Sequence, residues 1–129
     1  MGKYRDLQDA VFALFASVGW TDEDIKAFPV GFEGEKGVPP YIRVSILSSG
    51  ADINTTRASG LLMIEIFTAW GGGPSSASEI ADTLDSHFAK KILDGVQFFV
   101  STLTQFERDR DNSGLGRAVY SIPFSLFGV

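Results

Sequence analysis

The sequence predicts an α+β fold, with a single mixed or antiparallel sheet of four to five strands and two main helices packed on it. Two segments, near residues 3–18 and 77–92, carry apolar residues at three- and four-residue spacing, which is typical of amphipathic helices. Segments near 41–47, 60–69 and 116–129 alternate in the manner of half-buried strands. The length of 129 residues, without a linker or internal repeat, indicates one domain over the whole chain.

The first helix is expected over about 3–18, and Gly19 ends it. Thr21 and the three acidic residues that follow have the pattern of an N-cap and an acidic first turn. A short helix is therefore expected from there to about Ala27, before Pro29 stops it.

Two strands are expected next, after a loop that is rich in glycine and proline over 31–40. Residues 41–47 alternate cleanly and form the first strand, and 48–59 is a polar connection. The second strand covers 60–69, and both of its faces are apolar. We therefore expect that another layer or another subunit covers its second face, which consists of Leu61, Met63, Glu65 and Phe67.

The remaining residues predict a helix followed by strands. A Gly-Pro break precedes a capping box at Ser76–Glu79, which begins a helix that runs to about Ile92. Residues 96–108 form either a hairpin or one long bent strand, and 109–114 is a turn or an exposed loop. One face of the closing strand, 116–129, is apolar and consists of Ala118, Tyr120, Ile122, Phe124 and Leu126.

Composition excludes several classes of function. The chain has no cysteine, so it has no disulfide and no thiolate metal site. The net charge of −5 comes from 16 acidic and 11 basic residues, and the basic residues are scattered along the chain. This distribution argues against binding of duplex nucleic acid. No segment approaches the ~20 apolar residues of a membrane helix.

Three features could carry chemistry, and each has a simpler interpretation. Gly71–Ser76 opens a helix but lacks the lysine of a phosphate loop, so we favour a plain turn. His87, the only histidine, has no recognisable nucleophile motif, so we favour a helix-surface residue. Glu79, Asp82 and Asp85 lie at three-residue steps and are expected to form a solvated helix face. We therefore predict no catalytic residue, no metal and no cofactor.

Four segments together carry a family resemblance. Two are element starts: the helix start Tyr4-Arg5-Asp6-Leu7 and the strand start Pro40-Tyr41-Ile42-Arg43-Val44. The other two are the strand Ile64-Glu65-Ile66-Phe67, which precedes a Gly/Pro break and a Ser-Glu helix, and the closing segment Gly116-Arg117…Ser121-Ile122-Pro123-Phe124. In order and spacing they resemble the tail terminator (tail-completion) proteins of long-tailed, non-contractile bacteriophages. The resemblance spans nearly the whole chain, and none of its segments is a catalytic motif.

The resemblance implies a structural virion protein with no enzymatic activity and no cofactor. Such a protein forms a ring, typically of six subunits, which caps the tail tube, ends tail polymerisation and joins tail to head. Its partners are other copies of itself, the tail tube protein and a head-completion or neck protein. It is assembled in the host cytoplasm and lies at the head-proximal end of the tail. DNA passes through the lumen without specific binding, and an acidic lumen would let it slide.

The contact surfaces are expected in mixed-charge loops and two-faced strands. The alternating charges of 107–111 fit an exposed self-compensating loop or an interface equally well. Pro123 predicts that the closing strand is an edge strand, with Phe127 at its tip placed for a partner. The candidate subunit or tube interface is Asp52, Asn54, Arg57, Met63, Phe67, Arg108, Asp109, Arg110, Asp111, Arg117, Pro123 and Phe127.

Two alternatives remain open at this point. Within the same class, the protein is a neck or head-closure connector with a similar small fold. In a different class, it is a small non-viral ligand-binding domain, or an enzyme that uses the Gly71–Ser76 turn as an anion site and His87 as a base.

Overall fold

The computed structural model describes residues 3–23, 25–29, 39–48, 57–72, 74–93, 95–104, 106–109 and 114–127. Its elements are α1 (Lys3–Ala16), α2 (Val18–Thr21), β1 (Lys26–Pro29), β2 (Tyr41–Ser48), β3 (Arg57–Ala69), the 3₁₀ turn η1 (Trp70–Gly72), α3 (Pro74–Phe88), β4 (Ile92–Leu93), β5 (Val96–Phe98), β6 (Thr102–Leu103), β7 (Glu107–Arg108) and β8 (Leu115–Phe127).

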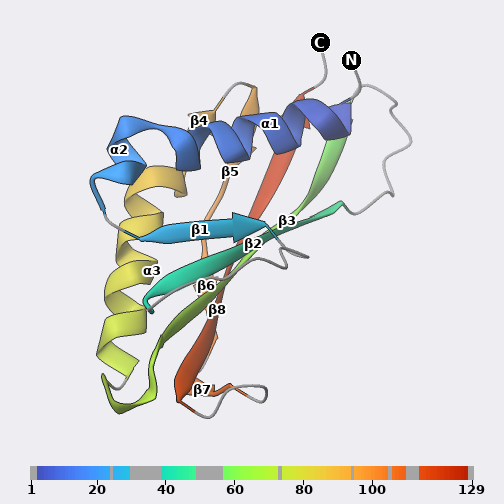
Figure 1. The fold of residues 1–129 in the computed structure, drawn as a ribbon. Coiled ribbons are helices and arrows are strands. Elements are labelled where there is room, and N and C mark those ends of the chain that lie inside the picture. Colours follow the sequence, from blue (N-terminus) through green and yellow to red (C-terminus); the bar gives the residue numbers. More distant parts are fainter. Residues whose placement is uncertain are drawn as a thin grey trace.

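The strands of the described residues form one mixed sheet in the order β1-β2-β3-β8-β5-β4, and β6 and β7 also pair with β8. β1 is parallel to β2, and every other pairing is antiparallel. Helix α1 crosses the strands near one end of the sheet, and α3 runs along its side (Figure 1). The mixed α+β class and the two main helices are confirmed. The expected four to five strands are wrong, because the described part of the chain contains eight.

The segment after α1 differs most from expectation. α1 ends at Ala16, and a separate turn of helix, α2, occupies Val18–Thr21, on both sides of the glycine that was expected to end the first helix. The short helix expected to about Ala27 is wrong, because Lys26–Pro29 is strand β1 beside β2. Pairing with β2 makes this segment a strand, and just before it the Trp20 indole Nε1 donates to the Ile25 carbonyl at 2.9 Å.

Helix α3 is shifted toward the N-terminus relative to its expected bounds. It begins at Pro74 instead of at the capping box and ends at Phe88 instead of about Ile92. Lys90 has a φ of 60°, in the left-handed region that is unfavourable for a residue with a side chain. The chain therefore turns there, and Ile92 enters strand β4.

β5, β6 and β7 are successive pieces of one interrupted strand that runs antiparallel to β8. Of the two arrangements predicted for 96–108, the bent strand is the one observed. The expectation that the closing strand is an edge is wrong, since β8 lies between β3 and these pieces. The Phe99 amide donates to the Pro123 carbonyl at 3.0 Å, so the side of Pro123 that lacks an N–H faces the gap between β5 and β6.

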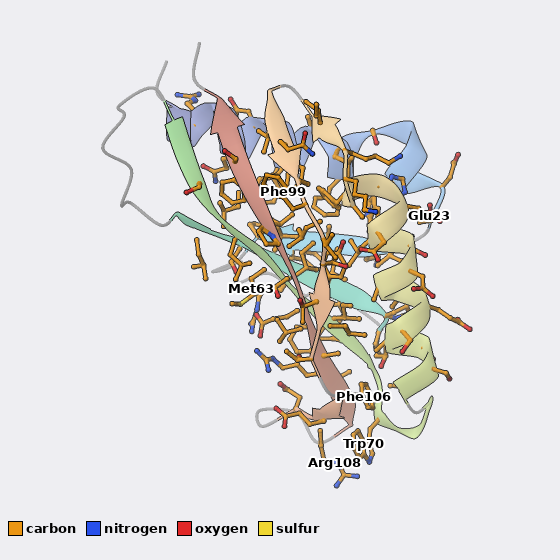
Figure 2. The ribbon with its side chains drawn as sticks, turned by 180° about the vertical axis from the view of Figure 1, so that it is seen from behind. Glu23, Met63, Trp70, Phe99, Phe106 and Arg108 are labelled. Atoms are coloured by element: carbon orange, nitrogen blue, oxygen red, sulfur yellow. The ribbon has the colours of Figure 1, made fainter. Side chains whose placement is uncertain are left out.

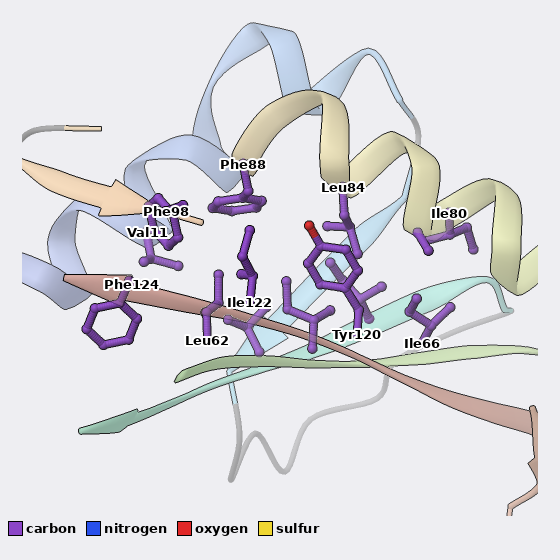
Figure 3. Packing of buried hydrophobic residues seen from close by; sticks show 14 of the residues in the cluster. Val11, Leu62, Ile66, Ile80, Leu84, Phe88, Phe98, Tyr120, Ile122 and Phe124 are labelled. Carbon is purple, nitrogen blue, oxygen red and sulfur yellow. The ribbon is translucent and has the colours of Figure 1, made fainter. Parts of the chain in front are cut away.

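The core lies between the helices and one face of the sheet, here called the inner face (Figure 3). Alternation along β2, β3 and β8 places every second side chain there, as predicted for each strand. α3 contributes Leu84 and Phe88, and the Phe88 ring meets Phe98 of β5 edge-on with centroids 5.2 Å apart. The residues of the inner face with full or nearly full burial include Ile42, Val44, Leu62, Ile64, Ile66, Ala118, Tyr120, Ile122 and Phe124.

A close approach between β2 and β3 generates a prediction at Gly60. A Cβ atom at this position would overlap the backbone carbonyl oxygen of Leu47 and lie 3.0 Å from the Phe124 ring. Gly60→Ala is therefore expected to lower the free energy of unfolding by about 1–3 kcal/mol, measured by urea denaturation. Gly71→Ala is the matched control, because a Cβ there meets no heavy atom within 4 Å. Equal stability of the two variants would contradict this account of the β2–β3 contact.

Candidate assembly surfaces

The second face of the sheet, here called the outer face, points away from α1 and α3. No helix of the described residues packs on it, and the helices in Figure 3 all lie on the other side of the strands. The register aligns its side chains in rows across β2, β3 and β8. The outer face consists of Tyr41, Arg43, Ser45, Leu47, Leu61, Met63, Glu65, Phe67, Leu115, Arg117, Val119, Ser121, Pro123 and Ser125.

Two arginines converge on one carboxylate at the centre of the outer face. Arg43 of β2 donates to both oxygens of Glu65, with Nε–Oε1 at 2.6 Å and Nη2–Oε2 at 2.8 Å. Arg117 of β8 donates from Nε to Glu65 Oε2 at 2.7 Å. The Glu65 side chain is 11% exposed, and those of Arg43 and Arg117 are about one-third exposed. The group, here called the ion triad, joins three neighbouring strands and carries a net charge of +1.

The electrostatics of the ion triad favour its charged form. Burial opposes ionisation of Glu65, but the hydrogen bonds from Arg43 and Arg117 outweigh it and hold the pKa of Glu65 below its usual value. The hydrogen bond to Glu65 raises the pKa of Arg43 further. Bidentate contacts between arginine and a carboxylate are among the stronger hydrogen bonds in proteins, so the triad links side chains of β2, β3 and β8 on this face.

An aromatic cluster adjoins the ion triad. The Tyr41 ring stacks on Phe67 with centroids 5.2 Å apart, and the Arg43 guanidinium lies 5.3 Å from the Phe67 centroid. Phe67 is 4% exposed, so residues of its own chain cover it. Burial, together with the charge of Asp109, raises the pKa of Tyr41. Asp109 therefore lies close enough to the outer face to influence its electrostatics.

The outer face brings together several of the residues predicted for the interface. Met63, half-buried, pairs with Ser121, and Pro123 is exposed on the neighbouring strand. Arg117 belongs to the ion triad, and Phe67 to the aromatic cluster. Arg57 and Phe127 pair with each other at the far end of β3 and β8. The predicted residues Asp52, Asn54, Arg110 and Asp111 lie outside the described residues.

Arg108 lies at the opposite tip of the sheet from Arg57. Its guanidinium is 4.7 Å from the Trp70 ring centroid, and the Trp70 ring in turn stacks on Phe106 at 5.4 Å (Figure 2). The tip of the β3–β8 pair is thus covered by a stack in which the Arg108 guanidinium, the Trp70 ring and the Phe106 ring follow one another. The stack explains why Gly116 is needed, since a Cβ there would overlap the Phe106 ring.

The chemical candidates from the sequence have structural partners. His87 Nε2 lies 2.9 Å from Glu23 Oε2, and its ring packs edge-on against Trp20, so it links α3 to the turn after α2. Glu79 and Asp82 are exposed, as expected for a solvated helix face. The expectation is wrong for Asp85, whose Oδ1 accepts hydrogen bonds from the Ser101 and Tyr120 hydroxyls, each at 2.6 Å.

Within the part of the chain that the structure describes, no group of three or more acidic or histidine side chains is placed to hold a metal ion. None of the described helices has the length and apolar character needed to cross a membrane. The absence of enzymatic activity remains a prediction.

The ion triad was not predicted from the sequence. Arg43, Glu65 and Arg117 each occupy an outward position in an alternating strand. A buried acid between two basic residues becomes visible only when the register of three strands is known, and β8 comes about 50 residues after β3 in the chain.

Comparisons with known proteins address the fold. No family model matches the sequence, and the search of curated proteins finds no match. Among solved structures, one protein whose description states no function matches with a TM-score of 0.67 and 13% identity, covering 95% of this chain and 94% of its own. A chain from the virion of a native gene transfer agent particle matches with a TM-score of 0.51 and 14% identity, covering 98% and 92%. At these identities the likeness establishes a shared fold.

The ion triad predicts an acid-dependent loss of stability. Because the pKa of Glu65 is lower in the folded than in the unfolded state, the carboxylate contributes stability that is complete above about pH 4.5 and is lost as the pH falls through the folded pKa. Glu65→Gln is expected to reduce the free energy of unfolding by about 1–3 kcal/mol at pH 7. The gap between the variant and the unaltered protein should shrink below pH 4.5 in urea titrations.

Asp9→Asn is the matched control, because Asp9 and Arg5 form an exposed pair at 4.0 Å. This substitution should leave the midpoint of unfolding nearly unchanged. A gap for Glu65→Gln that stays constant down to pH 3 (about 1.5 units below its usual pKa of 4.5) would show that the triad does not depend on ionised Glu65.

Proposed function

We propose that the protein is a structural component of a phage-like virion and that it acts as a tail terminator, a ring that caps the tail tube and joins tail to head. The observation that carries the proposal is the fold shared over 98% of the chain with a chain of the gene transfer agent virion. The sequence resemblance to tail terminators points the same way.

The surface chemistry supports an assembly role. The outer face is broad, and among the described residues no helix covers it; it mixes apolar side chains with the ion triad. Arginine is enriched at protein interfaces, and the outer face presents Arg43 and Arg117, each about one-third exposed. The net charge of −5 suits a ring through which DNA passes without sticking.

Under this proposal the partners are further copies of the chain, the tail tube protein and a head-completion protein. Such a ring would have six subunits, no cofactor and no enzymatic activity, and would lie at the head-proximal end of the tail. A neck or head-closure connector shares the same class. It differs in binding the head side of the joint instead of the end of the tube.

The proposal predicts closed rings of defined mass. Light scattering coupled to size exclusion should give about six times the chain mass of 14.0 kDa, and negative-stain images should show rings. Added to polymerising tail tube protein, the ring should shorten the tubes and label one end of each. Binding to head-completion protein but not to tubes would favour the connector. A protein that stays monomeric at every concentration and salt, and on tube ends, would contradict both.

A further inference from the structure

We propose that successive copies of this chain join head to tail, with an exposed apolar patch beside β5 and β6 of one copy docking in a groove beside β1 of the next. The inference rests on the self-assembly proposed above and assigns the contact. The patch, here called the edge patch, consists of Ile92, Phe99 and Val100, which are 67%, 44% and 65% exposed. Exposed apolar groups of this kind mark interaction sites.

The edge patch is held in place by hydrogen bonds on both sides of its exposed side chains. The Phe99 amide donates to the Pro123 carbonyl at 3.0 Å, and the Phe99 carbonyl accepts from the Lys90 amide at 3.1 Å. Farther along, the Ser101 hydroxyl donates to Asp85 at 2.6 Å, and the Thr104 amide donates to the Val119 carbonyl at 2.8 Å. A segment already fixed loses little conformational freedom on binding, which favours a docking role.

The sheet is incomplete beside β6, because no described strand pairs with the free side of β6. The backbone of Lys90 and Lys91 instead occupies that side of Phe98 and Phe99. β1 is the opposite edge of the same sheet among the described strands. Exposed edges of a sheet are places where another chain adds.

A groove with a volume of about 340 Å³ opens beside β1. Its apolar lining comes from the end of α1, from α2 and from β1, and consists of Phe15, Trp20, Ile25, Ala27 and Phe28. The volume falls at the lower end of the roughly 300–1,000 Å³ typical of binding pockets. It suits one or two apolar side chains such as those of Phe99 and Val100.

The charges beside the two surfaces have opposite sign. Lys90 and Lys91 are exposed next to the edge patch. Asp22 and Glu23 are exposed next to the groove, although the Glu23 carboxylate also contacts His87. Lys26 is the single charged residue in the lining itself. Complementary charges around an apolar contact favour the correct partner and oppose association of like surfaces. The occupant that this pairing selects is a second copy of the chain.

The two surfaces lie on opposite sides of the molecule. β1 lies toward the viewer in Figure 1, and Phe99 lies toward the viewer in Figure 2, which is turned by 180°. A contact between two different patches on opposite sides is heterologous, so it repeats from copy to copy and closes into a ring when the rotation per copy allows.

Charge insertion tests the assignment. Val100→Asp places a carboxylate in the edge patch, and we expect it to weaken assembly at least tenfold by analytical ultracentrifugation. Ser78→Asp adds the same charge on the exposed surface of α3 and should leave assembly unchanged. Leu47→Asp, at a 48% exposed position on the outer face, reports on the alternative surface. Circular dichroism should show that all three variants are folded.

Disulfide trapping tests the pairing of the two surfaces. Because the chain has no cysteine, the introduced cysteines are the only thiols that can react. Val100→Cys copies mixed with Lys26→Cys copies should form a covalent dimer on mild oxidation, whereas Ser78→Cys mixed with either should not. Weak assembly of Val100→Asp together with the trapped dimer supports the inference. Rings that form without the trapped dimer, or that lose assembly only with Leu47→Asp, overturn it and leave the proposed ring intact. An unaltered protein that never self-associates overturns both.

Discussion

The full-length antiparallel pairing of β3 with β8 is the constraint on which the rest of the structure depends. Both strands have 13 residues, and they pair from Arg57–Phe127 at one end to Ala69–Leu115 at the other. β2 extends the sheet from one side of this pair, and the pieces β5, β6 and β7 extend it from the other. Its inner face supports both main helices, and its outer face holds two members of the ion triad. A shift of register by one residue would exchange these two faces.

The sequence was sufficient to predict those elements in which apolar residues recur with one clear spacing, either helical or alternating. Alternation in β2 and β8 and helical spacing in α1 and α3 identified these elements and most of the core, because one buried face leaves a local pattern. β1 was missed because its four residues follow a helix-like start and are strand only by pairing with β2. Pro123 suggested an edge because a proline lacks a donor. Within the sheet, the gap between β5 and β6 also leaves the nitrogen of Pro123 without an acceptor to bond, so a proline is tolerated there.

The candidate surfaces were predictable in part for the same reason. The apolar second face of β3 indicated an unusual surface, and it is the outer face of the sheet. The ion triad could not be predicted, because Arg43, Glu65 and Arg117 meet only through the register of three strands. The edge patch escaped notice because the run Val96–Val100 is apolar except for Gln97. Sequence alone does not show that Phe98 points into the core while Phe99 and Val100 point outward.

The position of β8 has a consequence for biosynthesis. β8 follows the other described strands of the sheet in the chain, so β3 lacks its second neighbour until β8 has been synthesised. Pairings between segments so distant in the chain are slow to form, because loop closure precedes the contacts that stabilise it. The inner face, the ion triad and the fixed backbone of Phe99 all require β8. A nascent chain therefore cannot form these surfaces before β8 has paired with β3 and with β5.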